Sequence, residues 1–578
     1  MSDHSTADAD LDPVTLTIVW DRFEAICEEM GRTLERTGKS EAVCAGQDYS
    51  TALCDADGQV IAQGNFSPAH LGSMPYAVRH VLDYFDPAEL EPGDAIILND
   101  AFMGSGHMPD VFLVMPIFID GEVEAFSATV AHHVDIGGMT PGSQAVEATE
   151  VYQEGLRLFP TRVIRDGEIQ PWFERLVEAN VRIPEKVIGD VQAQQNALHR
   201  GKVLFKDLVD EYGLATSRAT VEEIYAETER SLRAEIEQIP DGEYRAEDYL
   251  DNYGEDTEPV KLVVTVRVDG DEITFDCAGT DPATPSAINS PINYTRAYLL
   301  FVTMGVTDME IHLNQGLIKP LSFEVPEGSA LNPQPPTATA ARAIYMQRIV
   351  DVTMQAFAHA VPDRVVAASS HVVNPNYGGT DPDTDEPFNV FDIIVGGIGG
   401  SDRKVGEEGV VPSFNISNIP VEVHEEDNPI TVERFGLVPD SGGAGRNRGA
   451  LAVRKDVTLH ADVTFTNLMD RTETPPPGLF GAEPGATART LLNPEAERRP
   501  LHPKGTYELA AGDTISLQAC GAGGYGSPTE RPPDDVVEDV RKGYVSREEA
   551  REVYGVDVRE TADGLEVDWD ATAGLREE

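Results

Sequence analysis

A small set of histidine and aspartate side chains has the residue types and the spacing of a metal site. His107 and Asp110 flank the Met108-Pro109 pair in a glycine-rich loop, and His132 follows in the segment AHHVDIGG. Two imidazoles and a carboxylate are a common ligand set for Zn²⁺, Fe²⁺ or Mn²⁺, and they leave positions for water or substrate. Water bound to such an ion becomes acidic enough to act as a nucleophile near neutral pH.

The elements around these residues should bring them together. The apolar run AIILND predicts a buried strand before the glycine-rich loop, and residues 111–135 predict a hairpin that turns at Asp120-Gly121. Because a hairpin places its two ends side by side, the two histidines and Asp110 can meet at one point. The alternative is that these histidines only cap loops through hydrogen bonds, and the spacing alone does not decide between the two.

The rest of the chain alternates helical and strand segments without a clean βαβ repeat, which predicts an α+β fold with mixed sheets. Residues 72–75 should lead into an apolar helix that runs through Leu82, and 261–277 should form two strands. From Gly396 onward, turns rich in glycine and proline separate short strands. Apolar spacing predicts helices over 13–36, 182–210, 220–238, 295–306 and 341–360, and a helical hairpin over 534–555.

The length of 578 residues is too great for one simple core and predicts several subdomains. We expect five regions, which are a disordered acidic tail (1–11), an N-terminal metal-site region (12–240), a central α+β region (241–395), a Gly/Pro-rich β region (396–530) and a C-terminal helical hairpin with a tail (531–578).

The formal net charge is −56, from 100 acidic and 44 basic residues. The acidic residues are spread along the whole chain. This distribution favours a solvated, self-repelling surface, as in halophilic proteins that stay soluble in high salt, over a local acidic ligand site. A nucleic-acid partner is not expected, because a phosphate backbone requires a basic footprint.

Several other classes of protein are disfavoured. No apolar run reaches the length of about 18 residues that a membrane span needs, and the polar N-terminus does not resemble a signal peptide. Five cysteines without a CxxC pair argue against a disulfide framework and predict a cytoplasmic protein. No glycine-rich stretch has lysine and serine at P-loop spacing, so we expect no nucleotide P-loop in this chain.

Many motifs, in order, resemble the hydantoinase B/oxoprolinase family. This family includes the second subunit of N-methylhydantoinase, the C-terminal half of 5-oxoprolinase, the caprolactamase B subunit and the large subunits of acetone-type carboxylases. The resemblance covers roughly residues 12–556 and rests on DYSTALCDADGQVIAQ, HLGSMP, LNDAFMGSGHMPDVFLVMPIF, ATVAHHVDIGG, QEGLRLFP, NSPINYTRA, LNPQPP and GAGGYGSPTERPPDDVVEDVRKGYVSREEAREVYGV.

The resemblance implies a metal bound by Asp48 of the DYS motif together with His107, Asp110 and His132. Spacing points independently to the last three, whereas Asp48 comes only from the resemblance. The ion expected is Zn²⁺, with Mn²⁺ or Fe²⁺ as alternatives, because mixed nitrogen and oxygen ligands suit all three.

Other polar residues in these motifs are catalytic candidates. His133 and Asp135 could support the ligands, since a carboxylate often orients a metal-bound imidazole through its second nitrogen. Glu154, in QEGLRLFP, could be a general base or a structural cap. His70, in PAHLGSMP, could face a substrate cavity or could be a strand-end histidine that bonds to the backbone.

The resemblance also implies a reaction and a partner. In this family an ATP-using A subunit phosphorylates the amide oxygen of a lactam or hydantoin, and the B subunit delivers metal-activated water to the product. The chain would then be the B subunit of a cyclic-amide hydrolase, in a heterotetramer with an A-type subunit. Hydantoin, 5-oxoproline and larger lactams are the candidate substrates.

The chain departs from the family pattern in two places. ARAIYMQR (341–348) replaces a polar stretch that commonly contains asparagine, and GGIGG near Gly396 lacks the usual acidic residue. These differences leave the substrate class open. Two other functions remain, namely the large subunit of an acetone- or acetophenone-type ATP-dependent carboxylase, and a non-catalytic scaffold for the A subunit.

Overall fold

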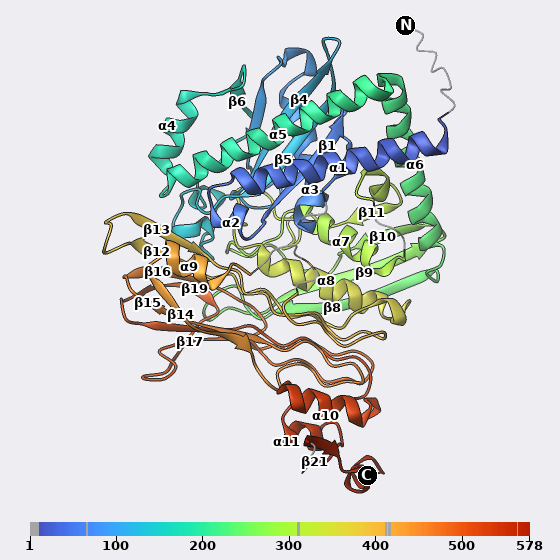
Figure 1. The fold of residues 1–578 in the computed structure, drawn as a ribbon, viewed down its shortest axis with the longest axis vertical. Coiled ribbons are helices and arrows are strands. Elements are labelled where there is room, and N and C mark those ends of the chain that lie inside the picture. Colours follow the sequence, from blue (N-terminus) through green and yellow to red (C-terminus); the bar gives the residue numbers. More distant parts are fainter. Residues whose placement is uncertain are drawn as a thin grey trace.

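The computed structural model describes residues 11–64, 67–308, 312–410, 413, 418–562 and 564–577. Over these residues it contains twelve α-helices and five β-sheets, in the arrangement drawn in Figure 1. The mixture of layers confirms the predicted α+β class. No helix in this described part is both long and apolar enough to cross a membrane.

A seven-stranded sheet forms the centre of the N-terminal part. Its strands lie in the order β2-β1-β5-β4-β3-β6-β7, and each paired neighbour is antiparallel. The predicted hairpin is confirmed as β4 and β5, which place Asp110 directly opposite His132. The strands are β1 (Tyr49–Asp55), β2 (Val60–Gln63), β3 (Ala95–Leu98), β4 (Asp110–Ile119), β5 (Glu122–His132), β6 (Thr161–Arg165) and β7 (Glu168–Ile169).

Both faces of this sheet are buried. Val111 and Leu113 of β4 point into one apolar cluster, whereas the alternating residues Phe112 and Val114 point into another. Helices α1 (Pro13–Thr37) and α5 (Pro184–Tyr212) cover the first face, as Figure 1 shows, and α3 (Pro68–Tyr84) covers the second. This double cover explains why the β4 sequence, DVFLVMPIFI, is almost continuously apolar.

The central part joins a four-stranded sheet to two buried helices. The strands are β8 (Gly242–Leu250), β9 (Val260–Asp269), β10 (Glu272–Asp276) and β11 (Leu321–Glu324), and the helices are α7 (Ile292–Val306) and α8 (Ala343–Phe357). They share the largest apolar cluster. The remaining helices before the glycine-rich region are α2 (Glu41–Cys44), α4 (Pro171–Asn180) and α6 (Leu214–Ile236).

Together with residues 376–391, the glycine-rich region forms two further sheets. Its segments pass backbone to backbone, since a Cβ atom on Gly449 or Gly521 would collide with the carbonyl oxygen of a neighbouring segment. One sheet contains β12 (Asn376–Thr380), β13 (Pro387–Phe391), β16 (Val463–Leu468) and β19 (Lys504–Leu509), and the other contains β14 (Ile430–Leu437), β15 (Val453–Leu459), β17 (Arg489–Leu492), β18 (Arg499–Leu501) and β20 (Thr514–Gln518).

The C-terminal elements form the far end of the molecule in Figure 1. The predicted helical hairpin is present, and a short β-hairpin and a last helix follow it. These elements are α10 (Pro533–Lys542), α11 (Arg547–Glu552), β21 (Val558–Thr561), β22 (Gly564–Val567) and α12 (Trp569–Glu577), while α9 (Val421–Asp427) lies earlier, beside β14. The region boundaries at 240, 395 and 530 stay predictions, and the tail predicted over 1–11 lies, up to residue 10, outside the described residues.

One sequence-based expectation about secondary structure is wrong. Helix α3 begins at Pro68, so residues 72–75 lie inside the helix and do not precede it. Proline is well suited to the first turn of a helix, because its fixed φ angle and missing N–H cost nothing there. Gly72 lies in the helix because α7 approaches closely, and a Cβ atom at Gly72 would overlap Ala297.

Candidate metal centre

Three neighbouring strands place the candidate ligands at one end of the seven-stranded sheet, where two of the strands begin and the third ends. Asp48 directly precedes β1, His132 ends β5 and Asp110 begins β4. The sheet order β1-β5-β4 makes these positions adjacent. The His132 N–H donates to the Asp48 carbonyl oxygen at 2.9 Å, which fixes the two backbones side by side.

The side chains of His107, Asp110 and His132 converge at this end of the sheet. Asp110 Oδ1 lies 2.7 Å from His107 Nε2 and 3.1 Å from His132 Nδ1. All three residues are buried, and each offers one ligand atom within 4.8 Å of the others. The structure therefore brings together the three residues that spacing alone selects.

The donor chemistry of this group fits a metal ion. His107 Nδ1 lies 3.1 Å from the Ala340 carbonyl oxygen, which can only accept, so Nδ1 carries the proton. Burial and the nearby Arg342 lower the pKa of His107 to about 4, so the imidazole is neutral and Nε2 presents a lone pair to Asp110 Oδ1. A proton or a metal ion between this nitrogen and the carboxylate oxygen removes the repulsion of their lone pairs, and two imidazoles with a carboxylate are a ligand set that Zn²⁺, Mn²⁺ and Fe²⁺ accept.

Asp110 is ionised in this environment. Burial opposes its charge, but the attraction of His107 and His70 when their rings are protonated, together with the permanent charge of Arg342, outweighs burial and lowers the pKa of Asp110 well below its usual range. A neutral imidazole beside a charged carboxylate is the protonation state in which these side chains bind metals.

Asp48 lies at the rim of the group. Its Oδ2 is 3.9 Å from His132 Nδ1 and its Oδ1 is 4.0 Å from His70 Nε2. Burial raises the pKa of Asp48, although His132 and His70 act in the opposite direction. A bound cation would favour the charged form of this carboxyl group.

His70 also reaches this group. It lies in the first turn of α3, where Nε2 is 3.4 Å from Asp110 Oδ2 and Nδ1 is 3.3 Å from Ser50 Oγ. The interpretation of His70 as a strand-end histidine bonded to the backbone is therefore wrong, because the residue is helical and its ring faces side chains.

His133 and Asp135 have other partners. His133 Nε2 lies 3.2 Å from Gln194 Oε1 on α5, and burial lowers the pKa of His133. The Asp135 carboxylate accepts hydrogen bonds from Arg182, through Nη1 at 2.9 Å and through its backbone N–H, and from the Gly137 N–H. These contacts bind Asp135 to the segment before α5, and the catalytic roles of both residues stay predictions.

Glu154 is connected to the group only through the backbone. Its Oε1 accepts hydrogen bonds from the N–H groups of Thr339 and Ala340, at 2.5 and 2.7 Å. Burial raises the pKa of Glu154 to about 8, despite these two donors. The structure thus gives Glu154 the contacts of a structural cap, and a role as general base stays a prediction.

Arg342 is a site residue that the sequence did not identify. Its Nη2 donates to Asp110 Oδ2 at 2.6 Å, its Nε donates to the Ser105 carbonyl oxygen at 2.6 Å, and its guanidinium lies 4.0 Å from the Tyr294 ring centre. One signal could have found it, namely a lone arginine between alanines just before a helix that is otherwise apolar at its start.

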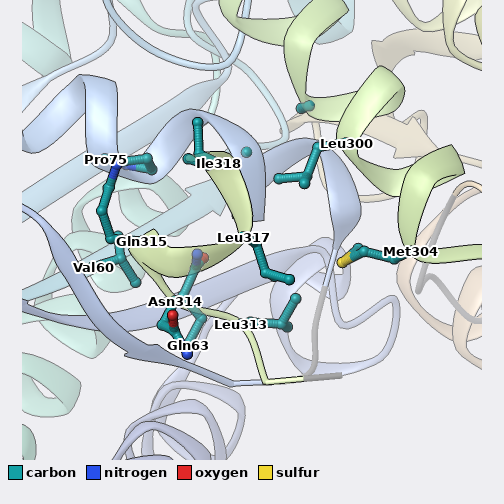
Figure 2. A pocket seen from close by; sticks show the side chains of 12 residues that line it. Val60, Gln63, Pro75, Leu300, Met304, Leu313, Asn314, Gln315, Leu317 and Ile318 are labelled. Carbon is teal, nitrogen blue, oxygen red and sulfur yellow. The ribbon is translucent and has the colours of Figure 1, made fainter. Parts of the chain in front are cut away.

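A narrow pocket of about 20 Å³ lies behind α3, between that helix and α7. Figure 2 shows its amide side chains, which include Gln63, Asn314 and Gln315. None of the candidate ligands lines it. Its volume suits a single water molecule, so we do not assign the chemistry to this pocket.

Comparisons with known proteins place the chain in a family and agree with its fold. Residues 12–528 match the family described as Hydantoinase B/oxoprolinase. The chain is 32% identical over 586 residues to a protein of Pseudomonas sp. strain NS671, which is named as the B subunit of a "Putative D-/L-hydantoinase", with 98% of both chains covered.

Two solved structures are similar over almost the whole chain. The crystal structure of an ATP-dependent caprolactamase from Pseudomonas jessenii gives a TM-score of 0.91 at 29% identity and covers 98% of this chain and 100% of that chain. The nucleotide-free acetone carboxylase gives a TM-score of 0.91 at 20% identity, covers 98% of this chain and 83% of that chain, and so shares the fold. The chain belongs to the hydantoinase B/oxoprolinase family.

Proposed function

We propose that this chain is the metal-bearing hydrolytic B subunit of an ATP-dependent enzyme that opens cyclic amides. The observation that carries the proposal is the buried group of His107, Asp110 and His132, in which two imidazole rings and a carboxylate converge. Support comes from relatives whose names refer to a hydantoinase B subunit and an ATP-dependent caprolactamase.

The residues of the site have separate tasks in this proposal. Asp48, His107, Asp110 and His132 would hold one divalent ion, with Zn²⁺ first and Mn²⁺ or Fe²⁺ as alternatives. Such an ion, when bound, supplies acidified water and polarises an oxygen of the substrate. These residues are buried at the end of the sheet, away from bulk water, and the low dielectric constant there strengthens each electrostatic contact.

A partner is part of the proposal. An unstrained lactam or hydantoin carbonyl is a poor electrophile, and no glycine-rich stretch of this chain has P-loop spacing. An A-type subunit would therefore use ATP to phosphorylate the amide oxygen, and this chain would hydrolyse the activated product. We propose a cytoplasmic heterotetramer of the two subunits, in keeping with the free thiols of all five cysteines.

A second candidate is an ATP-dependent carboxylase subunit, which the shared fold of acetone carboxylase favours. In that case the activated species would attack a carbonate-derived electrophile and form a new carboxylate. A non-catalytic scaffold for the A subunit is a third candidate, and bound metal in equimolar amount would argue against it.

The test is to co-express the chain with an A-type subunit and to assay ATP hydrolysis with hydantoin, 5-oxoproline and larger lactams. We expect ring opening coupled to ATP hydrolysis only when both subunits are present. Turnover of ATP by the purified chain alone, with 5-oxoproline or hydantoin, would contradict the division of labour. Incorporation of labelled bicarbonate into the product would identify the carboxylase instead.

A further inference from the structure

A short segment from the central part of the chain, residues 339–342, forms one side of the candidate metal centre. It directly precedes α8 and lies far in sequence from the strands that carry the ligands. Ala340 and Arg342 contact His107 and Asp110, respectively. We infer that this segment positions two of the proposed ligands, with Arg342 as the residue that orients Asp110, and the inference rests on the proposed function.

The two oxygens of Asp110 have different surroundings. Oδ1 faces the two imidazole nitrogens, His107 Nε2 and His132 Nδ1. Oδ2 accepts a hydrogen bond from Arg342 Nη2 at 2.6 Å and a short one from the Ser105 hydroxyl. Because Oδ2 is occupied by these donors, Oδ1 is the oxygen left for an ion. Arg342 therefore makes Asp110 a one-oxygen ligand.

The same segment fixes the ring of His107. The Ala340 carbonyl oxygen accepts from Nδ1 and leaves Nε2 for the ion. That carbonyl is itself held in place, because the buried Glu154 carboxylate accepts the N–H groups of Thr339 and Ala340. Glu154 is thus a positioning residue that acts through the backbone.

Arg342 is held firmly enough to perform this role. Its side chain is 3% exposed, its Nε donates to the Ser105 carbonyl oxygen, and the Tyr294 ring lies beneath the guanidinium. Gly106 has a φ angle of 101°, and a Cβ atom there would overlap Arg342 Cδ and Nε. Its Nε and Nη2 thus serve Ser105 and Asp110, which is the arrangement of a residue that positions a ligand.

The decisive variant is Arg342→Met, which keeps an unbranched apolar side chain but removes the guanidinium and every donor. We expect Co²⁺, used as the probe metal, to bind about 10–100-fold more weakly, the usual effect of losing an outer partner of a ligand. The visible absorption of the Co²⁺ protein should also change, because Asp110 is free to rotate. Arg342→Lys should restore part of the affinity, since one ammonium group can reach Asp110 but cannot bond Ser105 in the same geometry.

Arg348→Met is the matched control. Arg348 lies on α8, is fully buried and pairs with Asp248 and Asp470, away from the ligands. This variant should lose stability but keep the Co²⁺ affinity and spectrum of the wild type. An equal loss of affinity in both methionine variants would attribute the effect to the fold and overturn the inference.

The outcomes separate the inference from the proposed function. A wild-type chain that binds no Co²⁺ would overturn both. A wild type that binds Co²⁺, together with an Arg342→Met variant of unchanged affinity and spectrum, would overturn only the positioning role. If Arg342→Met does not fold, Arg342→Lys decides, and a spectrum and affinity equal to those of the wild type would overturn the inference.

Discussion

At the scale of single residues, two adjacent histidines have different surroundings. His132 and His133 follow each other at the end of β5, and successive residues of a strand point to opposite faces. His132 Nδ1 faces Asp110, whereas His133 Nε2 faces Gln194 on α5. Sequence adjacency therefore does not imply a shared role, and the two rings should respond differently to substitution.

We predict that His107→Ala and His132→Ala each lose the bound metal and the activity, while the fold stays largely intact. His133→Ala should keep most of the metal, because its ring contacts α5 and not Asp110. Elemental analysis of the purified variants, with circular dichroism as the check on folding, measures this. Full metal occupancy in His107→Ala, or loss of metal in His133→Ala but not in His132→Ala, would show that the ligands are assigned wrongly.

A second residue-scale prediction concerns pH. The pKa of Glu154 is about 8 in the folded protein, above its ordinary value of 4.5, so the folded state binds this proton more tightly than the unfolded state does. The contribution of this proton to the free energy of unfolding is fully present below pH 4.5 and is lost as the pH rises through 8. Glu154→Gln keeps the acceptor oxygen but cannot ionise, so its melting temperature should fall less than that of the wild type between pH 5 and pH 8.

Thermal melts in the presence of a chelator measure this difference, and the exposed Glu178→Gln serves as the control. The melting temperature of Glu178→Gln should differ from that of the wild type by the same amount at every pH. A constant offset between Glu154→Gln and the wild type from pH 5 to pH 8 would mean that Glu154 does not titrate in this range.

At the scale of elements, local patterns predicted some of the site and missed the rest. The apolar run and the Asp120-Gly121 turn specify the β4–β5 hairpin, and the hairpin alone brings Asp110 to His132. The Arg342 contact joins residues that are 232 positions apart. No periodic pattern in the local sequence predicts such a contact, because the contact depends on how α8 packs against the glycine-rich loop before β4.

The start of α3 was missed for a related reason. Glycine and proline within four residues normally indicate a turn, but Gly72 serves the contact between α3 and α7. Tertiary packing overrides the local signal there. The same holds for the glycine-rich region after residue 396, where glycine reflects close approach of backbones as well as turns.

This packing gives a prediction for Gly72→Ala. The new Cβ atom would lie 2.4 Å from Ala297 Cα, so the two helices must separate. Overpacking of this kind costs about 1–3 kcal/mol, against a gain of about 1 kcal/mol in helix propensity. We therefore expect a lower melting temperature for the variant than for the wild type.

Gly305→Ala on α7 is the matched control, because the nearest atom to its new Cβ is the flexible Met354 methyl group at 3.3 Å. We expect an equal or higher melting temperature for this variant. If Gly72→Ala also melts at or above the wild type, the helices have room to adjust and the packing argument is wrong.

At the scale of the whole molecule, several buried charges form ion pairs where parts of the chain distant in sequence meet. Arg348 and Lys504 both contact Asp470, and Arg471 contacts Asp351, all in the buried interface between α8 and the glycine-rich region. Removing one partner of such a pair is strongly destabilising, because it leaves an uncompensated buried charge. Because most acidic residues lie outside the buried interior, the net charge of −56 resides mainly in the solvated acidic residues spread along the chain.

This surface charge predicts a fold that salt stabilises. Repulsion among acidic groups extends about 30 Å at 0.01 M ionic strength, about 10 Å at 0.1 M and about 3 Å at 1 M. Raising KCl from dilute buffer to molar concentration should therefore raise the melting temperature. NaCl and tetramethylammonium chloride at equal ionic strength should act alike if screening is the cause, whereas a cation-specific effect would indicate bound ions. A melting temperature in dilute buffer that equals or exceeds the value in molar salt would exclude self-repulsion as a limit on stability.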